Sequence, residues 1–131
     1  MKRAIFVAAI TLALTSCVSA SLPPGAVLLG DRTVPFRGDH DVIEVGDYDG
    51  FFRSLVLVVE NNDVELFNLV VVYGNGERER IDTRLIFREG SRSRVIDLEG
   101  GKRRIRNVQF TYKTVGSWRD GRARVVLYGM R

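Results

Sequence analysis

The sequence predicts an all-β fold, a single-domain antiparallel β-sandwich of about eight strands, with a closed barrel as the second choice. Three observations favour it. Short β-branched and aromatic runs recur through residues 26–131, separated by Gly, Asn and Asp clusters, a pattern typical of strands joined by turns. No stretch of any length has the apolar spacing of an amphipathic helix. A chain of 131 residues has room for one hydrophobic core once an N-terminal leader is set aside.

The expected strands follow the apolar runs. In chain order they are Val27–Val34, Val42–Val45, Phe51–Glu60, Val64–Tyr73, Arg78–Phe87, Arg94–Leu98, Asn107–Thr114 and Arg122–Tyr128. Turn-forming pairs mark the boundaries: Asn61-Asn62, Asn75-Gly76, Glu89-Gly90, Gly100-Gly101 and Asp120-Gly121. Among these, Asn75-Gly76 favours a type I′ hairpin turn, because both residues accept positive φ angles.

Side-chain patterns place individual strands in the sandwich. Residues 55–59 and 69–73 are apolar on both sides, which predicts that their strands lie centrally. The last two strands instead alternate, so each exposes one face to water. In one, Val108, Phe110 and Tyr112 share the apolar face; in the other, Ala123, Val125 and Leu127 do so, opposite Arg122 and Arg124.

Residues 1–20 have the three parts of a secretion signal. Lys2 and Arg3 form a positive n-region, an apolar run of eleven residues covers 4–14, and small residues follow. The run is too short to cross a bilayer core, which takes about 20 residues. The sequence therefore predicts an exported protein of the periplasm or cell envelope. Residues 21–25 form a short tether, and residues 26–131 form the domain.

Two interpretations of the cleavage site overlap. Val18-Ser19-Ala20 fits the small-x-small rule of ordinary signal peptidase and leaves Ser21 as the first mature residue. Leu14-Thr15-Ser16-Cys17 resembles the bacterial lipobox, in which the cysteine is acylated and anchors the protein to a membrane. Cys17 is the only cysteine, so it is either the lipid attachment site or a small residue of a discarded leader. Neither interpretation leaves an intramolecular disulfide.

Charge is distributed unevenly. The net charge of +4, less the two cations of the leader, leaves +2 for the mature domain. Residues 21–65 hold nine acidic and three basic residues, a net −6, whereas residues 66–131 hold seven acidic and fifteen basic residues, a net +8. The two halves are expected either to pair in the fold or to leave an exposed anion-binding patch. That patch would consist of Arg92, Arg94, Lys102, Arg103, Arg104 and Arg106.

An acid-rich segment comprises Asp39, His40, Asp41, Glu44, Asp47 and Asp49. Within it, Asp47-Tyr48-Asp49-Gly50 is a weak calcium candidate, because hard cations take several oxygen ligands from a bent loop. The full twelve-residue calcium-loop pattern is missing, and loop aspartates more often form turns through backbone hydrogen bonds. We therefore expect no metal and no cofactor.

Catalytic signatures are also missing. The sequence contains no Gly-x-Ser-x-Gly elbow, no His-Glu-x-x-His pair and no phosphate-binding glycine loop. Two carboxylates alone can hydrolyse a glycosidic bond, but the sequence does not fix their separation. A non-enzymatic protein is the prediction.

Trp118 stands between Gly116-Ser117 and Arg119-Asp120-Gly121, which places it on a loop. An exposed indole there would stack on a sugar ring or anchor an interface. The favoured interpretation is that Trp118 folds back and caps one end of the sandwich.

Several fragments together resemble a bacterial family of small exported proteins described as domain of unknown function 2541. They are Leu28-Leu29-Gly30, Val71-Val72-Tyr73-Gly74-Asn75-Gly76, Ile96-Asp97-Leu98, Arg104-Ile105 with Val108, Phe110 and Tyr112, and Val125-Val126-Leu127-Tyr128-Gly129. The resemblance covers nearly all of the mature chain and implies an envelope β-domain. It implies no established activity and no functional residues.

These observations predict an envelope domain that binds an anionic envelope component or a protein partner. Nucleic acid is not expected as a partner of an exported protein, and contact with a membrane is expected only through a lipid anchor. The alternative is a carbohydrate-binding or carbohydrate-active module, calcium-dependent or not, that uses the acidic loop and Trp118. A third hypothesis is a structural protein that pairs through a sheet edge.

Overall fold

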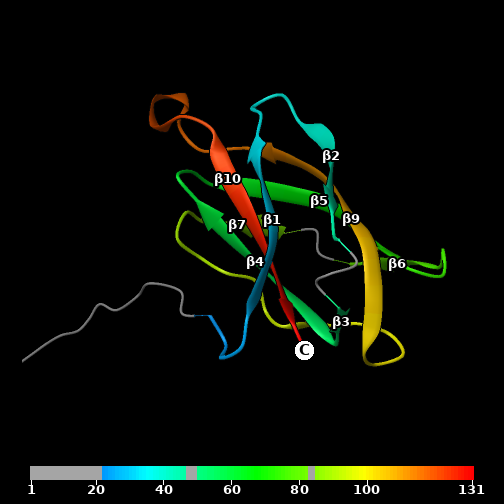
Figure 1. Cartoon of the computed structure of the whole chain (residues 1–131). Coiled ribbons are helices and arrows are strands. Elements are labelled where there is room, and N and C mark those ends of the chain that lie inside the picture. Colours follow the sequence, from blue (N-terminus) through cyan, green and yellow to red (C-terminus); the bar gives the residue numbers. More distant parts are fainter. Residues whose placement is uncertain (1–21, 47–49, 83–84) are drawn as a thin grey trace, which may run out of the picture.

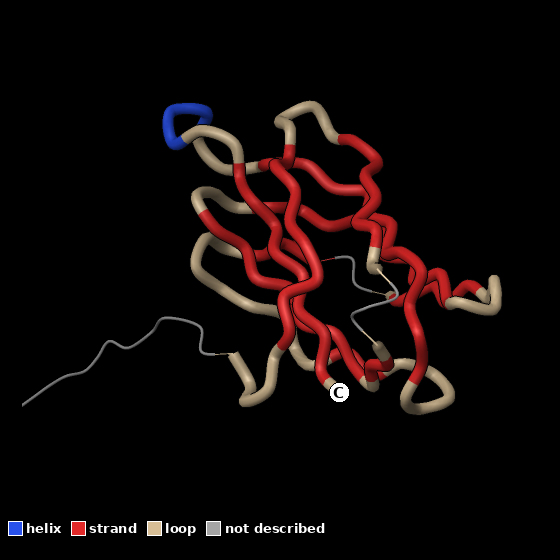
Figure 2. Tube along the Cα trace, viewed as in Figure 1, coloured by secondary structure: helices blue, strands red, loops and turns tan. Residues whose placement is uncertain are grey.

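The computed structural model describes residues 22–46, 50–82 and 85–131. Within these ranges the chain forms two antiparallel β-sheets around one hydrophobic core, and the only helical element is a 3-10 turn, η3 (Trp118–Asp120) (Figure 2). The predicted sandwich is confirmed, and the sheets do not close into a barrel. No helix in the described part of the chain is long and apolar enough to cross a bilayer.

Each predicted strand has a counterpart, and two are interrupted. The strands are β1 (Val27–Val34), β2 (Asp39–Glu44), β3 (Phe51–Phe52), β4 (Ser54–Glu60), β5 (Val64–Tyr73), β6 (Arg78–Ile81), β7 (Leu85–Phe87), β8 (Ile96–Asp97), β9 (Arg103–Thr114) and β10 (Ala123–Met130). The predicted strand at 51–60 bends at Arg53, and the one at 78–87 divides into β6 and β7. Two strands begin earlier than expected: β2 at Asp39 and β9 at Arg103.

The sheet order confirms the central positions predicted for β4 and β5. The four-stranded sheet runs β1-β10-β4-β8, and the six-stranded sheet runs β2-β9-β5-β6, with β3 beside β9 and β7 beside β5 (Figure 1). Strands β4 and β5 therefore have hydrogen-bonded neighbours on both sides. The alternating strand β9 buries Val108, Phe110 and Tyr112 completely.

The two sheets are joined at both ends of the sandwich. At one end the chain leaves β3 in the larger sheet, and the Arg53 N–H donates to the carbonyl of Met130 before β4 continues in the smaller sheet. At the other end the buried hydroxyl of Thr114 on β9 donates to the Val34 carbonyl at 2.6 Å and accepts from the Ala123 N–H at 3.1 Å. Thr114 thus connects β9 to β1 and β10.

Acidic and basic halves of the chain pair as one sequence hypothesis expected. Arg124 contacts both Asp31 and Glu60, at 2.7 Å in the second case. Arg88 approaches Asp63 at 3.9 Å, and Lys113 approaches Glu65 at 4.0 Å. All of these pairs are at least partly exposed, so each contributes little to stability.

The β5–β6 turn differs from the predicted type I′ geometry. The Tyr73 N–H donates to the Glu77 carbonyl, so three residues close the hairpin instead of two. Gly76 has a φ of 92°, whereas Asn75 is not among the described residues with positive φ. A type I turn followed by one left-handed residue is the usual three-residue solution.

Candidate anion-binding site

The first residues of β9 lie between two other segments of chain. Phe51 of β3 pairs with Arg104, and Tyr73 at the end of β5 pairs with Ile105. Strand alternation then buries Ile105 and leaves Arg104 and Arg106 exposed. The strand pairing therefore brings basic side chains next to aromatic ones from distant parts of the sequence.

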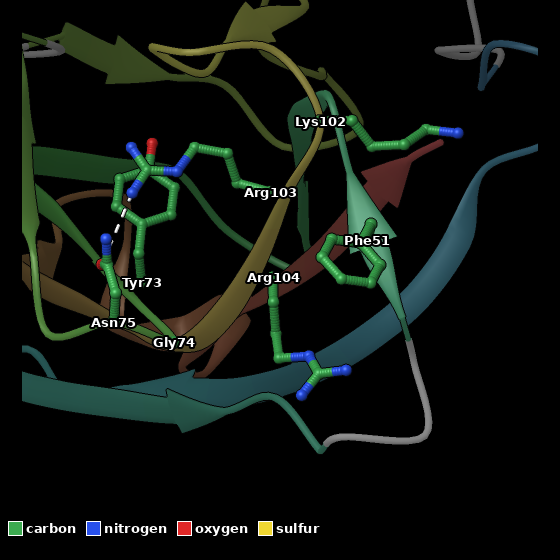
Figure 3. A pocket seen from close by; sticks show the side chains of 7 residues that line it. All are labelled: Phe51, Tyr73, Gly74, Asn75, Lys102, Arg103 and Arg104. Carbon is green, nitrogen blue, oxygen red and sulfur yellow. Dashed lines mark hydrogen bonds between the residues drawn. The ribbon is translucent and has the colours of Figure 1, made fainter.

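Two adjoining hollows lie along this segment. The first, of about 470 Å³, is lined by Phe51, Tyr73, Gly74, Asn75, Lys102, Arg103 and Arg104 (Figure 3). The second, of about 500 Å³, is lined by Glu44, Val45, Gly46, Gly74, Arg104, Ile105 and Arg106. Because Gly74 and Arg104 line both, we treat the hollows as one feature, the β9 groove.

Arg103 forms a neutralised wall of the groove. Its guanidinium carbon lies 3.7 Å from the centroid of the Tyr73 ring (Figure 3), and the guanidinium pairs with Glu77. Hydrogen bonds from Asn75 and from Arg103 hold the pKa of Glu77 below its usual value. The Tyr73 hydroxyl donates to Glu79, and burial raises the pKa of this tyrosine. The positive charge of Arg103 is thus already balanced within the protein.

Three other cations of the groove, Lys102, Arg104 and Arg106, have no carboxylate partner among the described residues. The Arg104 guanidinium carbon lies 5.1 Å from the Phe51 centroid, and Figure 3 shows the Lys102 and Arg104 side chains extending away from Arg103. These positions leave three positive charges available to a ligand.

Gly74 positions the two exposed arginines. Its N–H donates to the Arg104 carbonyl at 2.9 Å, and its carbonyl accepts from Arg106 Nη2 at 3.0 Å. A Cβ atom at this position would come within 3.3 Å of Arg104 Cδ. The missing side chain therefore lets the β5–β6 hairpin lie directly against the arginine stem, which restricts its motion before any ligand arrives.

The structure brings together only some residues of the predicted basic patch. Lys102, Arg103, Arg104 and Arg106 do gather at the groove, but Arg92 and Arg94 line neither hollow. Their segment runs beside β4 in the other sheet: Arg92 bridges to Val58, and Ser93 bonds to Leu57. Sequence proximity suggested one cluster, but the chain crosses between sheets after β8.

Four lining residues of the first hollow were not expected from the sequence. Phe51, Tyr73, Gly74 and Asn75 come from a strand and a hairpin far from β9 in the chain. In the sequence, Tyr73-Gly74-Asn75-Gly76 indicates only a strand end, a turn and part of the family resemblance. Only the strand pairing reveals that these residues share a site with the arginines.

Trp118 does not cap the sandwich, contrary to the favoured interpretation. Its side chain is 75% exposed, within η3 at the end of the molecule opposite to β3 (Figure 1). Asn62 anchors the loop that carries Trp118: its buried amide donates to the carbonyls of Ser117 and Gly121, both at 2.8 Å. Asn62 thus fixes the backbone of the loop, and the indole that the loop carries is exposed.

The remaining candidates are not placed in a site. Cys17, Asp47 and Asp49 lie outside the described residues, as does the leader. His40 is exposed, with Nδ1 3.3 Å from the Thr111 hydroxyl. In the ranges that the structure describes, no three His, Cys, Asp or Glu side chains gather in a way that would hold a metal ion.

Comparison with known proteins supports the resemblance seen in the sequence. A family model described as a domain of unknown function (DUF2541) matches residues 5–129. A search of curated proteins and a search of solved structures each returned no match. The matched span includes every residue that lines the β9 groove.

Proposed function

The chain belongs to the DUF2541 family, and because that description names no activity, we propose a function from the site: this is an exported, non-enzymatic domain that binds an anionic envelope component in the β9 groove. One observation carries the proposal. Lys102, Arg104 and Arg106 line a preformed groove and have no carboxylate partner among the described residues.

The chemistry of the groove suits charge recognition. Arginine and lysine stay protonated at neutral pH, so these side chains attract an anion and do not exchange protons with it. Guanidinium groups bind phosphate or carboxylate through paired N–H donors. Because Gly74 and Phe51 already hold Arg104, binding costs less side-chain entropy than it would for free arginines.

The proposed location follows from the leader. A positive start, an apolar run and small residues support export, and acylation of Cys17 would keep the domain at a membrane surface. The anionic groups available in an envelope are lipid headgroups, lipopolysaccharide phosphates and peptidoglycan carboxylates. Palmitate labelling of the expressed full chain, with Cys17→Ser as the control, tests the anchor separately from the groove.

Binding is tested with two variants of equal charge. The first replaces Lys102, Arg104 and Arg106 by serine; the second replaces Arg92, Arg94 and Arg122, which are exposed and line neither hollow. Co-sedimentation of the processed protein with anionic vesicles and with peptidoglycan should fall in the first variant and stay near the wild-type level in the second. Equal losses in the two variants would show that binding depends on net charge alone. Unchanged binding of the first variant would refute the proposed site.

A second candidate function is carbohydrate binding through Trp118. The supporting observation is that a largely exposed indole is presented on a loop fixed by a buried asparagine, and aromatic faces stack well on sugar rings. Because this is the only tryptophan, quenching of intrinsic fluorescence by neutral glycans, with and without calcium, reports directly on it. Glycans that leave both the fluorescence and the melting temperature unchanged would exclude this candidate.

A further inference from the structure

We propose that the β9 groove recognises two anionic groups of one ligand, one on each side of Arg104. The inference rests on the proposed function and specifies it further: the ligand is a bisphosphate or dicarboxylate on a short linker instead of a single anion. The observation behind it is that Arg104 is shared by two hollows, each of which contains a second unpaired cation.

The cations alternate along the groove. Lys102 belongs to the first hollow, Arg106 to the second, and Arg104 to both. Arg104 and Arg106 lie on either side of the buried Ile105 in β9, so both are on the exposed face of the strand, whereas Lys102 precedes β9 and lines the first hollow from the β8–β9 turn. An anion in the first hollow would therefore lie near Lys102 and Arg104, and one in the second near Arg104 and Arg106.

The two hollows differ in their other walls. The first exposes the Phe51 ring, which is 47% exposed and suits contact with the carbon atoms of a linker. The second has Glu44 as the only carboxylate among its described lining residues. A carboxylate close to an anion weakens its binding, so the second hollow should bind an isolated anion less well and contribute chiefly when the first anion is already bound.

Linkage of the two anions makes their combined affinity large. The second group binds from an effective concentration in the millimolar range or above, set by the linker. A single anion gains nothing from this effect. The structure therefore predicts a preference for the linked pair well beyond the twofold statistical advantage of carrying two equal groups.

A matched pair of soluble probes measures this preference. Propyl phosphate carries one phosphate, and propane-1,3-diyl bisphosphate carries two phosphates on the same three carbons. Calorimetric titration of the processed protein should give affinity for the bisphosphate about tenfold or more above the monoester. Arg106→Ser should remove most of that ratio with little change for the monoester, and Arg104→Ser should weaken both probes.

Two further variants separate charge from folding. Arg106→Lys keeps the charge and should keep part of the ratio, whereas Arg94→Ser, outside the groove, should change neither probe. An equal melting temperature for Arg106→Ser and the wild type would show that losing its bond to the Gly74 carbonyl has not unfolded the hairpin. If the melting temperature of Arg106→Ser falls, the test moves to Arg106→Lys. Should Arg106→Lys fold normally and yet bind the bisphosphate only about twofold more tightly than the monoester, the proposed role of the charge at position 106 is contradicted.

The bisphosphate chemistry occurs on lipid headgroups and on soluble phosphorylated sugars, and vesicles distinguish these sources. Cardiolipin has two phosphates on one glycerol, so its vesicles are compared with phosphatidylglycerol vesicles at equal phosphate content. Tighter binding to cardiolipin, sensitive to Arg106→Ser, indicates a lipid source; a preference confined to the soluble bisphosphate indicates a soluble one. If the wild type prefers neither double probe, yet Arg104→Ser still weakens monoester binding, the two-anion inference fails while the proposed function stands. If no phosphate probe binds, the two-anion inference fails; if co-sedimentation with peptidoglycan is then also insensitive to the groove variant, the proposed function fails with it.

Discussion

Replacement of Asn62 by alanine should remove a large part of the stability of the sandwich. The side chain is 3% exposed and makes three hydrogen bonds of 2.8 Å: two from Nδ2 to the carbonyls of Ser117 and Gly121, and one accepted by Oδ1 from the Asp63 N–H. A hydrogen bond contributes about 0.5 to 1.5 kcal/mol net. Three bonds lost together therefore cost about 3 kcal/mol, against a total near 5 to 15 kcal/mol for a typical domain.

Urea denaturation followed by tryptophan fluorescence measures the loss. With a slope of about 1 to 3 kcal/mol per molar urea, the midpoint of Asn62→Ala should fall by roughly 1 to 3 M. Since Trp118 is the only tryptophan and lies on the loop that Asn62 holds, its fluorescence anisotropy should also fall under native conditions. The control is Asn107→Ala, because Asn107 is half-buried and its side chain accepts one hydrogen bond of 3.4 Å from Gln109.

Gly116 offers an independent test of the same contact. A Cβ atom there would lie 1.8 Å from Asn62 Oδ1, so Gly116→Ala is expected to be severely destabilising in the wild type and much milder in Asn62→Ala. Contacting residues show such coupling in double-mutant cycles. A midpoint in Asn62→Ala equal to that of the wild type, or additive effects of the two substitutions, would refute the anchoring role of Asn62.

Three more outcomes are expected. Burial raises the pKa of Tyr73 and Tyr112 above the ordinary value of 10.0. Their contribution to the free energy of unfolding is therefore complete below pH 10 and is lost as the pH rises further. Ultraviolet titration should show neither tyrosine ionising until the chain unfolds. The pKa of Glu77 is held below its ordinary value of 4.5, so any stability difference between Glu77→Gln and the wild type should be present above that pH and vanish on acidification, as melting curves across the acidic range will show. A Cβ atom at Gly129 would lie 2.6 Å from the Phe52 ring, and Gly129→Ala should lower stability by about 1 to 3 kcal/mol in urea denaturation.

Most strands could be predicted because buried strand positions are occupied by apolar residues, which the sequence shows directly. The segments Val27–Val34 and Val64–Tyr73 have the bounds that their apolar runs indicate. Where a strand contains polar residues, the apolar pattern no longer marks where the strand begins or ends. The start of β2 at Asp39 and the start of β9 at Arg103 depend on hydrogen bonds to neighbouring strands, which sequence periodicity does not report.

Only the basic part of the candidate site could be predicted from the sequence, for a similar reason. Consecutive basic residues identified the β9 end of the groove, but the wall formed by Phe51 and Tyr73 depends on which strands pair. The same argument explains why Arg92 and Arg94, which run beside the other sheet, lie away from the groove. The loop that carries Trp118 is bonded to one buried amide from the β4–β5 turn, more than fifty residues away.

The connections at both ends of the sandwich have a consequence for how the molecule opens. Because β3 and β4 belong to different sheets yet follow one another, and because Thr114 binds β1 and β10 from β9, neither sheet can separate without disturbing the other. Amide protons in the middle of β4 and in the middle of β9 should then exchange with solvent through the same global event and with the same free energy. The β9 groove, built at one of these connections, would lose its shape only when the whole domain unfolds.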